Sequence, residues 1–313
     1  MKLMVCVPTV DRCYILRQWL DYHLHLFAKY DVLLHIHNNG STDKTDQVLS
    51  QYKEKYKLIS TSYSEKKEVY DVSVFKCLSN NFADYKWLIG DTYRIDEKVL
   101  SRVLEICKFK NRDFILLNIA NKIKKYKEDI DITEHNFALE HYSGLAASIS
   151  TVIIHQKILE DFPFKHYIGT RYMHTAILYH YIGFNRFSGV FLPNLNIQML
   201  PLINAKKINW AHGDESLKII TDCWLTLVLS LPNSFNLYSK LNSSKNVGII
   251  TNLFSLKGFL LMRSRGAISF LEILRLKKSL FICLTPKLYF IAIIASLIPV
   301  SFLSFFYKIK FNE

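Results

Sequence analysis

The stretch YKWLIGDTYRI, residues 85–95, organises the interpretation of the whole chain. Its apolar residues Trp87 to Ile89 predict a buried strand, and Gly90 and Asp91 follow directly. In an open α/β sheet, ligands bind outside the carboxyl ends of the strands. Glycine lets the backbone approach a ligand closely, and a carboxylate can hold a metal ion that is bound to phosphate. We therefore expect Asp91 at the centre of a site for a nucleotide or a metal-bound phosphate.

Strand and helix patterns alternate around this stretch. Apolar runs that predict strands cover residues 2–7, 32–37, 58–62, 85–89 and 114–119. Apolar residues at helical spacing cover residues 14–27, 43–56, 69–82 and 96–108. Such alternation is typical of βαβ units, in which helices connect parallel strands. We predict an α/β fold with a mostly parallel sheet flanked by helices.

The strand and helix patterns continue to about residue 200. Residues 121–134 are rich in charge and predict an exposed loop or hairpin insertion. Residues 148–155 and 186–192 predict strands, and residues 171–181 predict a helix. We assign residues 1–200 to the α/β domain and residues 201–313 to a helical C-terminal region.

The C-terminal region is apolar and basic. Helical patterns cover residues 217–231, 248–262 and 268–276, and residues 288–306 contain no charged residue. The last segment is just long enough to span a bilayer, although Pro299 interrupts it. A helix lying in the membrane interface, with nearby lysines on anionic lipid, is equally compatible, and a buried core helix is the third alternative. The two membrane arrangements place the activity at the cytoplasmic face of the inner membrane.

Charge and composition limit the classes of partner. The 313 residues carry a formal net charge of +13, which favours nucleic acid, anionic lipid or phosphorylated substrates. Nucleic acid is disfavoured because the basic residues are spread along the chain and lie beside apolar helices. The six cysteines form no C-x-x-C pair, and Pro8 and Asp11 interrupt the apolar run at the N-terminus. These features favour a protein of the cytoplasm, without a zinc site or disulfide framework.

Three motifs taken together resemble bacterial family 2 glycosyltransferases of the GT-A fold. They are VPTVDR at residues 7–12, NNGSTDKT at residues 38–45, and YKWLIGD at residues 85–91. The chain is most similar to the abequosyltransferase-like branch, whose members act in O-antigen and capsule synthesis, over residues 3–195. The resemblance implies transfer of a sugar from a nucleotide-diphosphate sugar to a hydroxyl of a lipid-linked glycan, with inversion. P-loop, dinucleotide, metalloprotease and hydrolase motifs are absent from the sequence.

The resemblance assigns binding roles to individual positions. It implies that the nucleotide sugar contacts Pro8, Thr9, Asp11, Asn38, Gly40, Asp71, Gly90 and Asp91. Asp91 matches the first acid of the D-x-D type motif, which holds Mg²⁺ or Mn²⁺ in this family. Thr92 and Tyr93 follow Asp91 in place of further acids. A metal-independent site is therefore an alternative, in which Arg94 or other cations neutralise the diphosphate.

Two histidines are candidates for chemistry. The resemblance places His174, on the predicted helix 171–181, where the family carries the general base of an inverting transfer. An imidazole with a near-neutral pKa can take a proton from an acceptor hydroxyl. The structural alternative is a core or capping histidine. His212 is a weaker candidate for a metal ligand, since a solvated loop that caps a helix at Asp214 explains its surroundings better.

The degenerate acid motif also motivates an alternative function from another class. In it, the chain is a catalytically silent protein of the same fold that binds a glycan or nucleotide, or supports an assembly at the membrane.

Overall fold

The computed structural model describes residues 2–79, 82–203 and 215–303. Within these residues, nine strands form one sheet in the order β3-β2-β1-β4-β8-β6-β9-β5, and β7 pairs with β9. The strands are β1 (Leu3–Thr9), β2 (Leu33–Asn38), β3 (Ile59–Tyr63), β4 (Tyr85–Leu88), β5 (Tyr93–Arg94), β6 (Phe114–Ile119), β7 (Ile130–Ile132), β8 (Val152–His155) and β9 (Gly189–Met199).

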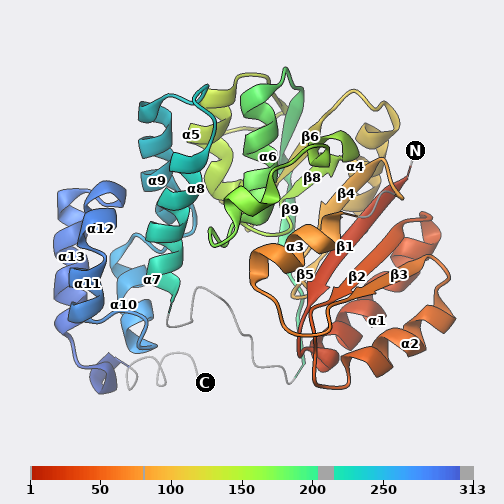
Figure 1. Ribbon diagram of the computed structural model, residues 1–313, viewed down its shortest axis with the longest axis horizontal. Coiled ribbons are helices and arrows are strands. Elements are labelled where there is room, and N and C mark those ends of the chain that lie inside the picture. The colour runs from red at the N-terminus through yellow and green to blue at the C-terminus, as the bar shows by residue number, and fades with distance from the viewer. Residues whose placement is uncertain (1, 80–81, 204–214, 304–313) are drawn as a thin grey trace.

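The helices alternate with the strands in the first part of the chain, up to β9, and follow one another in the second part (Figure 1). The first part has α1 (Cys13–Lys29), α2 (Thr45–Lys55), α3 (Tyr70–Leu78), α4 (Glu97–Lys108), α5 (His135–Ala146) and α6 (Met173–Phe184). The second has α7 (Ser216–Lys218), a π-helical turn η4 (Ile219–Cys223), α8 (Trp224–Ser230), α9 (Leu237–Ile250), α10 (Leu256–Ser264), α11 (Phe270–Arg275), α12 (Lys277–Cys283) and α13 (Pro286–Leu297).

The predicted parallel sheet is confirmed for its N-terminal half and is wrong in part for the remainder. Strands β3, β2, β1 and β4 run parallel, and β6 runs parallel to β9. Strand β8 lies between β4 and β6 and is antiparallel to both. The sheet is therefore mixed, and the direction of β8 is fixed by pairing between residues far apart in sequence.

Apolar side chains alternate between the two faces of the sheet. In β1, Val5 and Val7 belong to a core that α1, α2 and α4 cover, whereas Met4 and Cys6 belong to the opposite core under α3, α5 and α6. Successive side chains of a strand point to opposite faces, so one apolar strand contributes to both cores. The result is a three-layer arrangement with strand ends open at the edge of the sheet.

The structure adds two local elements, β7 and α5, and corrects one predicted helix. The charged segment 121–134 contains the short strand β7, which pairs with β9. The sequence patterns predict no helix at residues 135–146, where the structure has α5. The single helix predicted for residues 248–262 is two helices, because the chain turns between α9 and α10 and brings Phe254 against Gly248. A Cβ at Gly248 would lie 1.8 Å from the Phe254 ring, so only glycine fits there.

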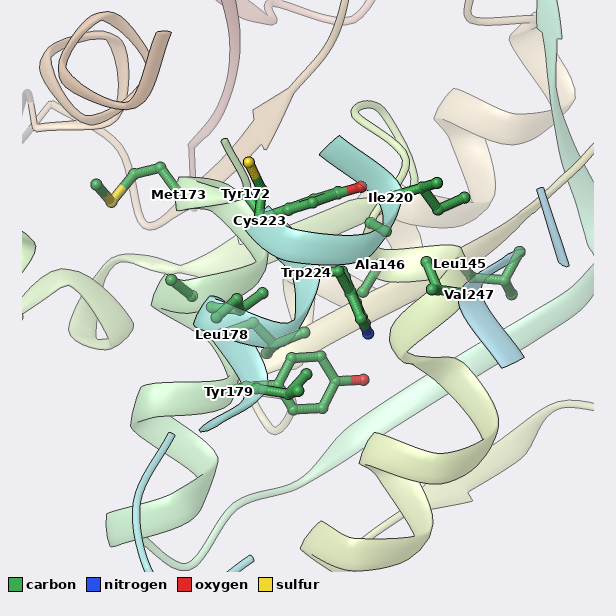
Figure 2. Packing of buried hydrophobic residues seen from close by; sticks show 14 of the residues in the cluster. Leu145, Ala146, Tyr172, Met173, Leu178, Tyr179, Ile220, Cys223, Trp224 and Val247 are labelled. Carbon is green, nitrogen blue, oxygen red and sulfur yellow. The ribbon is translucent and has the colours of Figure 1, made fainter. Parts of the chain in front are cut away.

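The C-terminal helices share a core with the α/β layers. Figure 2 shows Trp224 of α8 packed among Tyr172, Leu178 and Tyr179, with Val247 of α9 beside Leu145 of α5. The rings of Tyr172 and Trp224 meet edge to face, with centroids 4.9 Å apart. These helices therefore contribute to the core that also contains α5 and α6.

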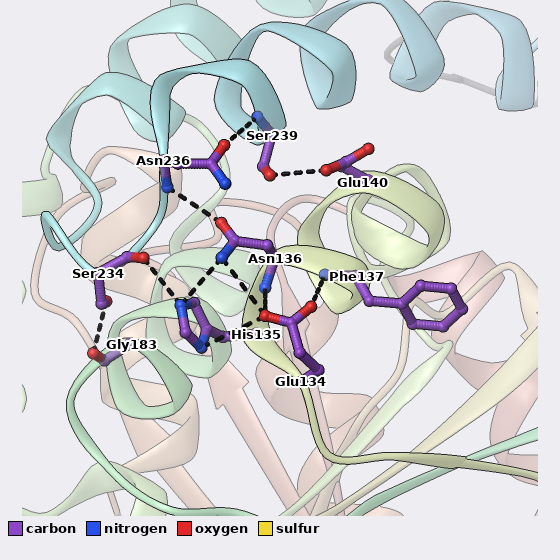
Figure 3. Close-up of polar contacts among 9 residues, drawn as sticks. All are labelled: Glu134, His135, Asn136, Phe137, Glu140, Gly183, Ser234, Asn236 and Ser239. Carbon is purple, nitrogen blue, oxygen red and sulfur yellow. Dashed lines mark hydrogen bonds and ion pairs between the residues drawn. The ribbon is translucent and has the colours of Figure 1, made fainter.

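Polar contacts fix the same junction (Figure 3). Glu134 caps α5 by accepting hydrogen bonds from the backbone N–H groups of Asn136 and Phe137. The Asn136 side chain accepts from the backbone N–H of Asn236, whose own side chain caps α9. The Ser239 hydroxyl donates to Glu140 over 2.7 Å. Helices α5 and α9 are thus capped and joined by one polar network.

The apolar segment predicted at residues 288–306 is interrupted within the part that the structure describes, residues 288–303. Helix α13 ends at Leu297, before Pro299, where the missing N–H and the ring of proline disfavour a continuing helix. Over the described part of the chain, every helix is too short or too polar to cross a bilayer. Buried Ala292 and Ala295 pack α13 against the neighbouring helices.

Candidate functional site

A cavity of about 460 Å³ opens at the carboxyl ends of β1 and β4. One wall comes from these strand ends and includes Pro8, Thr9, Gly90 and Asp91. The opposite wall comes from the start of α6 and the segment after α5, and includes Arg171, Tyr172, His174 and residues 147–149. Ile219 of the C-terminal region also lines it. The volume falls within the range of small-molecule sites, which is about 300–1,000 Å³.

Asp91 is buried and paired with a cation. Its side chain is almost completely covered, and its Oδ1 lies 2.5 Å from Nη1 of Arg12. The Thr9 hydroxyl donates to the other carboxylate oxygen over 3.4 Å. Burial raises the pKa of the Asp91 carboxyl, and the charge and hydrogen bond of Arg12 oppose that shift. The carboxylate therefore depends on Arg12 to stay ionised in this setting.

Arg12 is a cavity residue to which the sequence analysis assigned no role, although it ends the VPTVDR motif. It immediately precedes α1, lines the cavity, and its side chain is 23% exposed. The preceding residue, Asp11, has a left-handed backbone with φ of 51°. Its backbone N–H donates to Ser41, and its carboxylate accepts from the backbone N–H of Thr42. These contacts fix the loop that carries Arg12.

Three predicted binding residues hold the loops behind the cavity wall. The Asp11 carboxylate is used by Thr42, and the Asn38 side chain donates to Asp46 over 2.6 Å. Gly40 has φ of +65°, and a Cβ there would lie 2.4 Å from the backbone of Lys66. Their neighbour Asn39 lines the cavity instead, and its amide both accepts from and donates to the backbone of Glu68. The NNGSTD segment thus clamps two loops together.

Asp71 organises the opposite wall. Its side chain is 1% exposed, and it accepts hydrogen bonds from the backbone N–H groups of Gly169, Arg171 and Met173. Burial raises the pKa of this carboxyl, and the three N–H groups oppose that shift. Asp71 lies next to the cavity wall and supports the turn that leads into α6. The sequence does not predict this contact, because the turn lies 98–102 residues after Asp71 in the chain.

His174 lies on the first turn of α6 and borders the cavity. Its Nε2 lies 3.2 Å from the carbonyl oxygen of Ala147, which makes Nε2 the protonated nitrogen. Its Nδ1 is buried and makes no hydrogen bond with the described residues. Burial lowers the pKa of His174 to about 4, below the near-neutral value expected from the sequence. The imidazole is therefore neutral, a weaker base than expected, with an acceptor at Nδ1.

The donor set around Asp91 does not fit a divalent metal. Among residues 2–79, 82–203 and 215–303, no group of three His, Cys, Asp or Glu side chains lies in position to hold an ion. Glu68 lines the same cavity, but its carboxylate binds Ser64 and Lys76. Arg94, expected as a replacement cation, pairs with Asp96. His212 lies outside the described residues.

The comparisons identify the fold. No family model and no curated protein matches the chain. Among solved structures, it is similar to S. aureus TarS residues 1–349, with a TM-score of 0.55, 14% identity, and coverage of 93% of this chain and 90% of that chain. TarS with UDP-GlcNAc gives a TM-score of 0.54 and 15% identity over the same shares.

A further similar structure is the mannosyltransferase PcManGT from Pyrobaculum calidifontis in complex with GDP-Man and Mn²⁺. Its TM-score is 0.54 with 11% identity, and the match covers 100% of this chain and 88% of that chain. TarS and PcManGT are glycosyltransferases of the GT-A fold. At these identities the likeness establishes the fold, and the GT-A fold expected from the sequence motifs is confirmed.

Proposed function

We propose that this chain is a glycosyltransferase that moves a sugar from a nucleotide-diphosphate sugar to a hydroxyl of a glycan. The observation that carries the proposal is the cavity at the carboxyl ends of β1 and β4, which joins Thr9, Asp91 and Arg12 on one wall to His174 on the other. Ligands of open α/β sheets bind at this edge. The similar proteins were solved with UDP-GlcNAc and with GDP-Man, which supports a donor of this class.

The two walls suggest how the substrates divide the cavity. The donor lies along Pro8, Thr9, Gly90 and Asp91, and the loops held by Asp11, Asn38 and Gly40 keep this wall in place. Asp71 positions the other wall, where the acceptor enters. The α/β domain of residues 1–200 supplies both walls, and the region 201–313 closes the acceptor side through Ile219.

His174 is the proposed general base of an inverting transfer. Its Nδ1 takes the proton of the acceptor hydroxyl while that oxygen attacks the anomeric carbon, and the nucleoside diphosphate leaves with the bonding electrons. The carbonyl of Ala147 at Nε2 stabilises the imidazolium that forms. Since Nδ1 is buried in this structure, the transfer requires that the acceptor hydroxyl gain access to it from the cavity that His174 lines.

The C-terminal region is proposed to dock the enzyme on the cytoplasmic face of the inner membrane. Large apolar side chains stay exposed on α11, α12 and α13, among them Leu271 (77%), Phe281 (76%) and Phe290 (62%). Lys277, Lys278 and Lys287 are exposed on the same helices. Apolar and basic side chains together match a bilayer that contains anionic lipid. The acceptor would then be a lipid-linked glycan in surface polysaccharide synthesis, such as O-antigen or capsule, as in the abequosyltransferase-like branch.

A donor screen tests the proposal. The protein is incubated with UDP-, GDP-, CDP- and TDP-sugars, with and without bacterial lipid extract, and release of the nucleoside diphosphate is measured. We expect release from one donor class, greater with lipid extract, and lowered on the order of 100-fold in His174→Gln. His166→Gln, an exposed histidine away from the cavity, is the matched control.

Two outcomes would contradict parts of this proposal. Full activity of both His174→Gln and Asp91→Ala would remove the site assignment. Binding of a nucleotide sugar without any turnover would favour the catalytically silent alternative. That alternative is motivated by the incomplete acid motif, in which Thr92 and Tyr93 follow Asp91.

A further inference from the structure

The site around Asp91 contains a charge pair where a metal-dependent transferase needs several oxygen ligands. Asp91 is 2% exposed, and its two oxygens face Arg12 and Thr9. A divalent ion at this carboxylate would have to displace the guanidinium at 2.5 Å, against repulsion between like charges. Arg12 and Asp91 are 79 residues apart in sequence, so only the fold brings them together.

The residues after Asp91 cannot complete a metal site. The carbonyl of Thr92 accepts from the backbone N–H of Leu200, and the carbonyl of Tyr93 accepts from the Trp19 indole. Thr92 leads into β5, which begins at Tyr93 and pairs with β9. The carbonyl oxygens of Thr92 and Tyr93 are thus already hydrogen-bonded, and neither residue has a side-chain carboxylate. Magnesium and related ions prefer several oxygen ligands in a defined geometry.

We propose that Arg12, held in place by Asp91, supplies the positive charge that binds the donor diphosphate, so that donor binding needs no divalent metal. This inference rests on the proposed function and assigns the cation within the same site. A guanidinium carries its N–H donors in a planar fork that suits both carboxylate and phosphate. Arg12 lines the cavity and is partly exposed, which places its charge within reach of a bound diphosphate.

The charges of the cavity agree with this assignment. Asp91 and Arg12 together are neutral, and two further cations, Lys67 and Arg171, line the same cavity. Arg171 is held by Glu215 over 2.7 Å. Glu68, the other acid among the described lining residues, pairs with Lys76. A diphosphate therefore meets two carboxylates, Asp91 and Glu68, that are each already bound by a cation.

Asp91 is accordingly a positioning residue, because it acts on the diphosphate through Arg12. The buried carboxylate limits the orientations of the guanidinium, and a fixed cation binds a phosphate at a lower entropic cost than a free side chain. Lysine would keep the charge at position 12 but lose the fork, so Arg12→Lys should bind more weakly than the wild type.

Calorimetric titration with UDP, GDP, CDP and TDP tests the inference, once in EDTA and once in Mn²⁺. We expect at least one nucleoside diphosphate to bind, with a Kd that Mn²⁺ changes by less than about twofold. Loss of a charge-assisted contact in Arg12→Ala should raise that Kd by on the order of tenfold. Since Arg12→Ala leaves a buried carboxylate unpaired, the double variant Arg12→Ala/Asp91→Asn provides the same test without that charge.

Arg17→Ala is the matched control, because Arg17 lies close in sequence to Arg12 but is exposed on α1 outside the cavity lining. Its Kd should stay within about twofold of the wild type, as expected for a residue outside the site. Binding that requires Mn²⁺, or a double variant that binds as tightly as the wild type, would overturn the role of Arg12 and leave the transferase proposal intact. Binding of none of the four nucleotides in either buffer would contradict both.

Discussion

The carboxylate of Asp71 accepts a hydrogen bond from the backbone N–H of Gly169, 98 residues further along the chain, over 2.8 Å. The same carboxylate also accepts from Arg171 and Met173. One buried acid on α3 therefore holds the turn that leads into α6. Because His174 follows this turn directly, the position of the proposed base depends on a residue outside the cavity lining.

Removing this acid should weaken both stability and activity. Asp71→Ala leaves three backbone N–H groups without their acceptor, and we expect the free energy of unfolding to fall by roughly 2–4 kcal/mol. Urea denaturation measures this change. Asp129→Asn, which removes an exposed partner of Arg102, should cost less than about 1 kcal/mol. Equal effects of the two substitutions would show that Asp71 does not hold the turn.

Buried His23 should make the protein sensitive to mild acid. Its Nδ1 donates to the carbonyl of Trp19, and its Nε2 accepts from the backbone N–H of Ile95 over 2.9 Å. Burial lowers the pKa of His23 from 6.5 to about 4. The unfolded chain then binds more protons than the folded chain between these values. Stability from this residue is complete above pH 6.5 and falls as the pH drops toward 4, by about 3 kcal/mol in all.

Urea denaturation at about pH 7 and about pH 5 measures this loss. His23→Gln keeps an acceptor for Ile95 but cannot be protonated, so its stability should depend less on pH. His166→Gln, at an exposed histidine, should keep the wild-type pH dependence. The same dependence in both variants would assign the acid sensitivity to other groups, such as His174.

Gly40 should tolerate no side chain. Alanine there would combine the strain of a left-handed backbone with a contact of 2.4 Å to the backbone of Lys66. Gly266 has φ of +79° with open space around it, so Gly266→Ala isolates the strain alone, about 1–2 kcal/mol. We expect Gly40→Ala to lower the melting temperature further and to weaken nucleotide binding. Similar melting temperatures for the two variants would contradict the close approach of the loops.

The exposed apolar side chains of α11 and α12 should support binding to lipid vesicles. Leu271→Ser/Phe281→Ser should reduce co-sedimentation with vesicles that contain phosphatidylglycerol, because each change removes apolar area from the bilayer. Phe109→Ser replaces a side chain of similar exposure directly after α4 and is the control. Binding that is equal for both variants, or absent for the wild type, would contradict docking through these helices.

Local patterns were sufficient to predict much of the N-terminal half. Helix α1 has Leu16, Trp19 and Leu20 at helical spacing, and all three are buried in the structure. The strand that ends before Asp91 is equally clear, since its short apolar run stops at Gly90. The convergence of Thr9 and Asp91 also followed, because parallel strands end at one edge of the sheet. These predictions rest on the spacing of apolar residues along the chain and on the parallel direction of strands joined by helices.

Contacts between distant residues were out of reach of the same reasoning. The Arg12–Asp91 pair depends on side-chain direction at the end of a loop, and the resemblance drew attention to Asp11 instead. The support of His174 by Asp71 depends on packing between α3 and α6. The antiparallel direction of β8 depends on which strands it pairs with. In each case, the feature depends on a contact between residues far apart in sequence, which local sequence patterns do not determine.

The shared core of Figure 2 has a consequence for synthesis of the chain on the ribosome. The segments that carry Tyr172, Leu178 and Tyr179 emerge before the helices that cover them. Until Trp224 and Val247 have left the exit tunnel, the nascent α/β layers display an apolar surface that is prone to aggregate or to bind chaperones. The proposed base at position 174 therefore reaches its final environment only after translation of the last third of the protein is well under way.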